Sequence, residues 1–168
     1  MTPPKPTHAI VYYSLTGHTD QLAHRLASSL NADVFRISVA RYERGFLGYI
    51  RAGFDSLTGR LPATEPIPDL SGYDGVSIGA PIWTSYPASP LRAYLAQKPR
   101  LPKTVGCFLT CGAPSPNQKA FGMVEHLLGR KIVAQMIIPN ALDDASVTTR
   151  LTQYCSAVHA ASGSQATL

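Results

Sequence analysis

The feature that most constrains this chain is an apolar run, residues 8–13, that leads through a short polar loop directly into a helical pattern at residues 18–30. The loop, residues 14–19 with the sequence SLTGHT, contains small hydroxyl side chains and one glycine. A helix that begins at such a loop presents backbone N–H groups without intrahelical partners and the positive end of the helix dipole. This arrangement predicts an anion-binding cradle that suits a phosphate group.

The side chains of the loop fit this interpretation. Ser14, Thr16 and Thr19 would add hydroxyl donors, and Gly17 allows a close backbone approach and a positive φ. Because the loop contains no lysine or arginine, it differs from the G-x-x-x-x-G-K-[ST] polyphosphate loop, and no G-x-G-x-x-G dinucleotide motif is present. Taken alone, the stretch is equally compatible with a strand, a turn and a threonine N-cap. The choice between a phosphate cradle and an ordinary strand, turn and cap therefore depends on the rest of the sequence.

Apolar runs alternate with helical patterns along the whole sequence. Strands are predicted at residues 8–13, 34–38, 76–80, 105–110 and 132–138, and helices at 18–30, 87–97, 118–129 and 144–160. The spacing of apolar residues in 40–60 indicates one or two further short helices. Five strands alternating with helices predict an α/β fold with a parallel sheet and helices on both faces. Since ligands bind beyond the carboxyl ends of such strands, the loops 14–19, 81–86 and 110–117 are expected to converge there.

Length and composition predict one domain, residues 1–168, with flexible ends at 1–7 and 161–168. A chain of 168 residues with 45% hydrophobic residues can bury a substantial core. Residues 1–7 resemble neither a signal peptide nor a membrane helix, and no membrane span is expected. Cys107, Cys111 and Cys155 lack metal-site spacing, so we expect reduced thiols and a cytoplasmic protein without a metal site.

The net charge of +5 predicts attraction to anionic ligands or partners, including nucleotides. The positive charges are dispersed among glycine and aliphatic residues, and no nucleic-acid recognition motif accompanies them. We therefore expect a solvated basic surface and no nucleic acid partner. The sequence does not define the oligomeric state.

Two motifs resemble the flavodoxin family. Residues 14–19 match the family's phosphate loop T-x-T-G-x-T with serine in place of the first threonine, and residues 73–83 (YDGVSIGAPIW) are similar to the segment leading to its first flavin-contacting loop. Both motifs occur in the right order, and the similarity extends from His8 to about Ala160. The resemblance implies a flavodoxin-like three-layer sandwich, a five-stranded parallel sheet of order 2-1-3-4-5, and non-covalently bound FMN.

The resemblance also implies three groups of FMN-binding residues. They are Ser14, Thr16, Gly17, His18 and Thr19 for the phosphate; Pro81, Ile82, Trp83 and Thr84 for the isoalloxazine; and Thr110, Cys111, Gly112 and Ala113 for its pyrimidine side. FMN needs an anion cradle and an apolar surface for its ring, and Trp83, the only tryptophan, falls at the stacking position. Residues 110–118 contain no aromatic residue, so one flavin face is expected to be open unless Tyr86 folds over it.

Simpler interpretations exist for three of these residues. Trp83 is also compatible with a core aromatic position, although a place between Pro81 and Pro87 favours a loop. His18 is as compatible with a solvent-facing residue of the first helical turn as with a phosphate donor. Cys111 fits a small packed side chain better than a redox partner of the flavin.

The sequence thus predicts an FMN-binding redox protein without catalytic side chains, and favours an electron carrier between a reductase and an acceptor. The alternative is an NAD(P)H-dependent FMN reductase of quinones or similar acceptors, which the basic surface and the open flavin face favour. A third reading is a serine hydrolase, because residues 75–79 (GVSIG) formally match the G-x-S-x-G elbow. Ser77, however, is expected inside an apolar strand rather than at a strand-to-helix turn.

Overall fold

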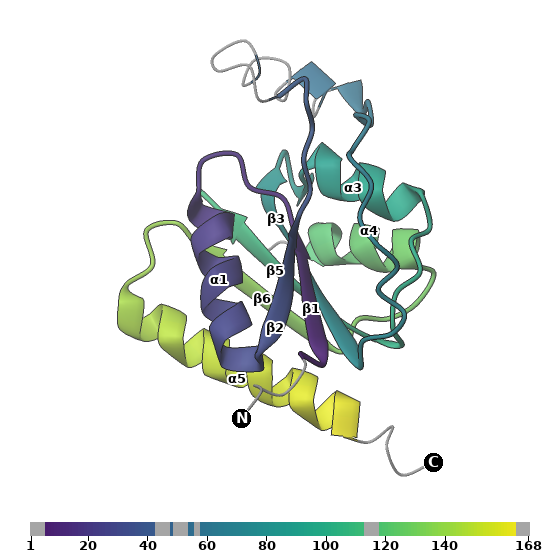
Figure 1. Ribbon diagram of the computed structural model, residues 1–168. Coiled ribbons are helices and arrows are strands. Elements are labelled where there is room, and N and C mark those ends of the chain that lie inside the picture. Colours follow the sequence, from purple (N-terminus) through teal and green to yellow (C-terminus); the bar gives the residue numbers. More distant parts are fainter. Residues whose placement is uncertain (1–5, 43–47, 49–53, 56–57, 113–117, 164–168) are drawn as a thin grey trace.

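The computed structural model describes residues 6–42, 48, 54–55, 58–112 and 118–163 (Figure 1). Its centre is a parallel sheet of order β2-β1-β3-β5-β6. The strands are β1 (His8–Tyr12), β2 (Ala32–Arg36), β3 (Gly75–Trp83), β5 (Thr104–Cys111) and β6 (Ala134–Pro139). Helices α1 (His18–Leu30) and α5 (Asp144–Gly163) cover one face, and α3 (Ser89–Ala96) and α4 (Gln118–Leu128) cover the other (Figure 1).

The central strands β1, β3 and β5 are mostly apolar and buried because both faces of the sheet are covered there, whereas the edge strands β2 and β6 also contain polar, exposed residues. In β1, Ala9 and Val11 join the core under α3 and α4, whereas Ile10 and Tyr12 join the core under α1 and α5. This alternation follows from the two-residue period of a strand. It explains why residues 8–12 read as one continuous buried run, with all five residues buried.

The predicted three-layer architecture is confirmed, and the five parallel strands, counted along the chain, lie in the predicted order 2-1-3-4-5.

The structure adds a sixth strand, β4 (Tyr86–Pro87), which pairs antiparallel with the end of β3. The prediction of a simple loop at 81–86 was therefore wrong, because this segment is a β-hairpin. Its two-residue turn, Thr84 and Ser85, has φ values of 49° and 73°. Positive φ at both turn residues matches the right-handed twist of paired strands, but Thr-Ser lacks the Asn-Gly signature that announces such a turn.

Other boundaries differ by a few residues. Strand β2 begins two residues before the predicted 34–38, and α5 continues to Gly163, beyond the predicted end at residue 160 and into the expected flexible tail. Most of the segment 40–60, where short helices were predicted, lies outside the described residues; of the described ones, Gly48, Phe54, Asp55 and Thr58 are helical. Within the described part of the chain, the helices are too short or too polar to cross a bilayer.

Candidate functional site

Three connections meet at the carboxyl edge of the sheet, as the sequence predicted. The Tyr13 ring, just after β1, lies edge-on to the Trp83 ring at the end of β3, with a centroid distance of 5.8 Å. The hydroxyl oxygens of Thr19 in α1 and Thr110 in β5 lie 2.8 Å apart. Thr110 in turn is the register partner of Pro81. These contacts bring together one residue or more from each predicted loop.

The loop between β1 and α1 leaves the N-terminus of α1 without a side-chain cap. Gly17 is the N-cap, with φ of 95°, and no side chain caps the helix. The threonine N-cap considered from the sequence was therefore wrong. The Gly17 N–H donates to the buried Ser14 hydroxyl over 3.2 Å, which shapes the loop before the helix. A Cβ at Gly17 would meet no atom within 4 Å, so the space beside this N-cap residue is open. The first-turn N–H groups that follow it have no intrahelical partners and suit an anion.

The polar side chains of this loop differ in what they can offer an anion. Thr16 and His18 are exposed. Thr19 is 1% exposed, and its hydroxyl is already hydrogen-bonded to Thr110. Thr16 is thus the loop threonine that is free to reach a ligand in the solvent-facing cradle, while Thr19 fastens α1 to β5.

An arginine that sequence reasoning missed lies next to the cradle. The Arg36 guanidinium, at the end of β2, donates from Nη2 to the Ser14 carbonyl oxygen over 3.2 Å. The loop itself contains no cation, so Arg36 supplies positive charge from the neighbouring strand. The strand order 2-1-3 was the available signal, because it places the end of the second strand beside the end of the first.

The hairpin presents two aromatic rings on one side. Trp83 is partly exposed, and Tyr86, its direct cross-strand partner, is 37% exposed. Directly opposed residues of an antiparallel pair project to the same face. Tyr86 therefore lies beside Trp83. The sequence had left open that Tyr86 folds over the second flavin face, and this arrangement does not place it there. Pro81 and Ile82 are partly buried, and Thr84 is exposed at the turn.

The third connection begins with buried residues. Thr110 and Cys111 are 3% and 6% exposed, Gly112 is exposed, and Ala113 lies outside the described residues. Burial raises the pKa of the Cys111 thiol, and the opposing effect of Arg150 is smaller. A protonated, buried thiol is a poor nucleophile, which supports the small packed side chain over the redox partner.

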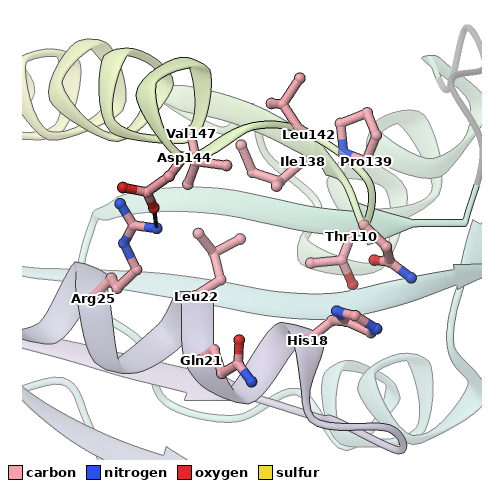
Figure 2. A pocket seen from close by; sticks show the side chains of 11 residues that line it. His18, Gln21, Leu22, Arg25, Thr110, Ile138, Pro139, Leu142, Asp144 and Val147 are labelled. Atoms are coloured by element: carbon pink, nitrogen blue, oxygen red, sulfur yellow. Dashed lines mark hydrogen bonds and ion pairs between the residues drawn. The ribbon is translucent and has the colours of Figure 1, made fainter.

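A cavity of about 220 Å³ lies at the same edge, between α1 and the start of α5 (Figure 2). Two predicted residues, His18 and Thr110, line it together with Gln21, Leu22, Arg25, Ile138, Pro139, Asn140, Leu142, Asp144 and Val147. An ion pair of 2.6 Å between Arg25 and Asp144 spans one side. The cavity extends the candidate site toward α5. Among the described residues, no cluster of three or more His, Cys, Asp or Glu side chains is placed to hold a metal ion.

Ser77, the nucleophile of the hydrolase alternative, is sealed inside the sheet. Its Oγ lies 2.9 Å from Nε2 of His8 and accepts a hydrogen bond of 2.9 Å from the Tyr154 hydroxyl. Ser77 has no exposed surface and sits within β3, not at a strand-to-helix turn. A substrate carbonyl cannot reach it, so this serine–histidine contact argues for a structural hydrogen-bond chain and against a hydrolase.

Comparisons with known proteins agree with the topology. No protein-family profile and no curated protein matches the chain. Among solved structures, it is similar to a flavoprotein from Lactobacillus acidophilus NCFM in complex with FMN (23% identity, 86% of this chain and 98% of the other, TM-score 0.62). It is also similar to oxidised Flavodoxin 1 from Bacillus cereus (17% identity, 90% of this chain and 95% of the other, TM-score 0.56). A further similar structure is an NADH:FMN oxidoreductase (16% identity, 92% of this chain and 89% of the other, TM-score 0.53). These likenesses show that the fold is flavodoxin-like.

Proposed function

We propose that this chain, which has the flavodoxin-like fold, binds one FMN at the carboxyl edge of its sheet and serves as a redox protein. The observation that carries the proposal is the junction of an open helix N-terminus with a partly exposed tryptophan, linked through Tyr13. FMN has a phosphate at one end and a flat, largely apolar ring system at the other, so it requires both features in one site. The similarity to a flavoprotein in complex with FMN supports the same choice.

Each connection would take one part of the cofactor. In the phosphate loop, Thr16, His18 and the first-turn N–H groups after Gly17 would hold the phosphate, and Arg36 would add charge. Ser14 and Thr19, whose hydroxyls are already hydrogen-bonded, would hold the loop in shape. Pro81, Ile82, Trp83 and Thr84 would line the ring, Tyr86 would extend the surface beside Trp83, and Thr110, Cys111, Gly112 and Ala113 would border the pyrimidine edge. Bound FMN would supply the electron-transfer chemistry, while these residues orient it and control the access of solvent and partners.

We favour an electron carrier, which receives electrons from a reductase and passes them to an acceptor. The described side chains of the site include no buried acid–base pair of the kind that proton-transfer catalysis uses. A net charge of +5 indicates that its redox partners carry acidic surfaces. The three cysteines are free and buried, which is consistent with a reducing cytoplasmic compartment.

The alternative is an NAD(P)H-dependent FMN reductase of quinones or similar acceptors. One observation favours it: Trp83 and Tyr86 share one face of the hairpin, which leaves the opposite flavin face without an aromatic cover from this element. A nicotinamide ring could approach that face. The likeness to an NADH:FMN oxidoreductase is compatible with this alternative as well.

Two measurements test these proposals in turn. Calorimetric titration of the protein with FMN is expected to show saturable binding with one site per chain, and its absence would refute the cofactor assignment. Stopped-flow mixing of the FMN-loaded protein with NADPH or NADH then separates the two functions. A flavin that stays oxidised until a separate reductase is added indicates the carrier, whereas rapid bleaching indicates the reductase.

Replacing Thr16 with valine is expected to weaken FMN binding by about 1 to 3 kcal/mol, because the exposed hydroxyl would no longer donate to the phosphate. The shape of the side chain is retained, so the effect should be confined to affinity and measurable by the same titration. Thr152→Val, which removes an exposed hydroxyl from the distant α5, is the matched control. Equal affinities for the two variants would mean that the loop does not hold the phosphate.

A further inference from the structure

Three aromatic side chains form a continuous row that leads from the candidate site into the protein. The ring centroids of Trp83 and Tyr13 are 5.8 Å apart with an interplanar angle of 85°, and those of Tyr13 and Tyr42 are 6.5 Å apart at 68°. Both separations lie in the range of edge-to-face aromatic pairs. Tyr13 and Tyr42 are only 4% and 5% exposed, so Trp83 is the end of the row that meets solvent.

The inner end of the row carries a proton acceptor. The Tyr42 hydroxyl donates to Oδ2 of Asp55, whose side chain is 2% exposed, and lies 3.4 Å from the Ser89 hydroxyl. The same carboxylate oxygen is paired with Arg41. The Arg41 guanidinium carbon also lies 5.4 Å from the centroid of the Tyr42 ring. Tyr42 is thus held between a buried carboxylate and a cation.

We propose that Tyr42, Tyr13 and Trp83 form a one-electron relay that returns an electron to oxidised Trp83. When a one-electron oxidant converts the Trp83 indole to its radical cation, one electron moves from Tyr42 through Tyr13 to Trp83. The Tyr42 O–H bond breaks, and its proton passes to the Asp55 carboxylate. The products are neutral Trp83, a neutral Tyr42 phenoxyl radical and the carboxylic acid of Asp55, so charge and atoms balance.

The surroundings of Tyr42 require the electron and proton to leave together. A tyrosyl radical cation would lie in a buried site next to the Arg41 cation, where like charges repel strongly in the low local dielectric. Loss of the proton to Asp55 removes that second positive charge. Arg41 loses its ion-pair partner in this step, but its side chain is 43% exposed and can be solvated by water.

The relay goes beyond the proposed flavin site and does not depend on it. Trp83 is the partly exposed ring of the row and therefore the one that an oxidant in solution or in the site meets first. The relay moves the oxidising equivalent away from this ring and stores it on a buried phenol. All of the groups involved belong to the chain itself.

Pulse radiolysis of the flavin-free protein with azide radical as the one-electron oxidant tests this inference. Because Trp83 is the only tryptophan, the tryptophanyl absorption reports on this residue alone. The expected result is a first-order decay of that absorption, independent of protein concentration, with matching growth of the tyrosyl absorption. A decay that depends on protein concentration would show that no internal donor exists and would overturn the relay.

Tyr42→Phe identifies the donor. The substitution keeps the ring and removes the hydroxyl, and we expect the first-order rate to fall by at least about tenfold, which corresponds to about 1.4 kcal/mol in activation free energy. The matched control is Tyr73→Phe, because the Tyr73 hydroxyl also donates to a carboxylate, Asp33, over 2.6 Å, but its ring lies outside the row. A normal rate in Tyr42→Phe, or an equal loss in Tyr73→Phe, would refute the assignment.

The role of Asp55 is tested without relying on a single variant. In the unmodified protein, transfer in D₂O should be slower than in H₂O, because the Tyr42 proton moves in the same step. Asp55→Asn, which keeps the size of the side chain but removes the base, should slow the transfer and abolish this isotope effect. An unmodified protein with the same rate in both solvents would exclude proton transfer to Asp55.

Discussion

Replacing Gly79 with alanine is expected to destabilise the protein by about 3 kcal/mol, the upper part of the range for inserting a methyl group into a packed core. Gly79 in β3 is the register partner of Phe108 in β5. A Cβ at this position would lie 2.1 Å from Cζ and 2.2 Å from Cε2 of the Phe108 ring. The ring has no exposed surface and cannot move outward, so either the two central strands separate or the ring leaves its rotamer.

Urea denaturation of Gly79→Ala and the unmodified protein measures this effect. Gly122→Ala in α4 is the control, since a Cβ there meets no atom within 4 Å and alanine favours the helix by about 0.5 to 1 kcal/mol. Adding Phe108→Leu to Gly79→Ala should recover part of the loss, because the two substitutions act on the same space. A Gly79→Ala protein as stable as the original would contradict the close packing of β3 and β5.

Acidification from pH 7 to pH 5 is expected to lower the free energy of unfolding by about 2 kcal/mol through His8 alone, and by about 3 kcal/mol at pH 4. Burial, with a smaller contribution from His159, lowers the pKa of His8 from 6.5 to about 4. Well above pH 6.5 the imidazole is neutral in both states and contributes no pH dependence. Between pH 6.5 and 4 the unfolded chain binds a proton that the folded chain excludes, so stability falls as the pH falls.

The comparison of the unmodified protein with His8→Gln isolates this contribution from that of the carboxylates. Glutamine can keep a hydrogen bond to Ser77 but does not titrate, so the difference in unfolding free energy between the two proteins should shrink from pH 7 to pH 5. A parallel pH dependence for the unmodified protein and His8→Gln would show that His8 is accessible to protons in the folded state.

The parallel sheet and the meeting of three loops were predictable because local patterns carry them. Each buried strand must be apolar on both faces, and each helix shows its own period, so the order of elements can be read along the chain. The hairpin of Trp83 and Tyr86 was not predictable in this way. Its turn uses threonine and serine at positive φ, residues that carry no recognised hairpin signal.

In the candidate site, too, contacts between residues close together in the chain were predictable and contacts between distant residues were not. Ser14, Thr16 and Gly17 lie within one short loop, so their proximity follows from the chain itself. Arg36 comes from another strand, and its position beside the Ser14 carbonyl depends on which strands are neighbours. The alternative of a threonine N-cap on α1 is not found, because the N-cap is Gly17 and the Thr19 hydroxyl is hydrogen-bonded to Thr110 in β5, a contact that no local pattern indicates.

The sequence by itself determined the alternation of strands and helices, the polar loop before the first helix and the glycine that this loop requires. Those features depend on residues close together in the chain, where propensity and periodicity act directly. Only the tertiary structure decided that Tyr42 reaches Trp83 through Tyr13, that Asp55 receives the Tyr42 hydrogen bond and that Ser77 is closed off by His8 and Tyr154. Such contacts join residues from 13 to 77 positions apart, and packing of the whole sheet with its helices, rather than any local pattern, brings them together.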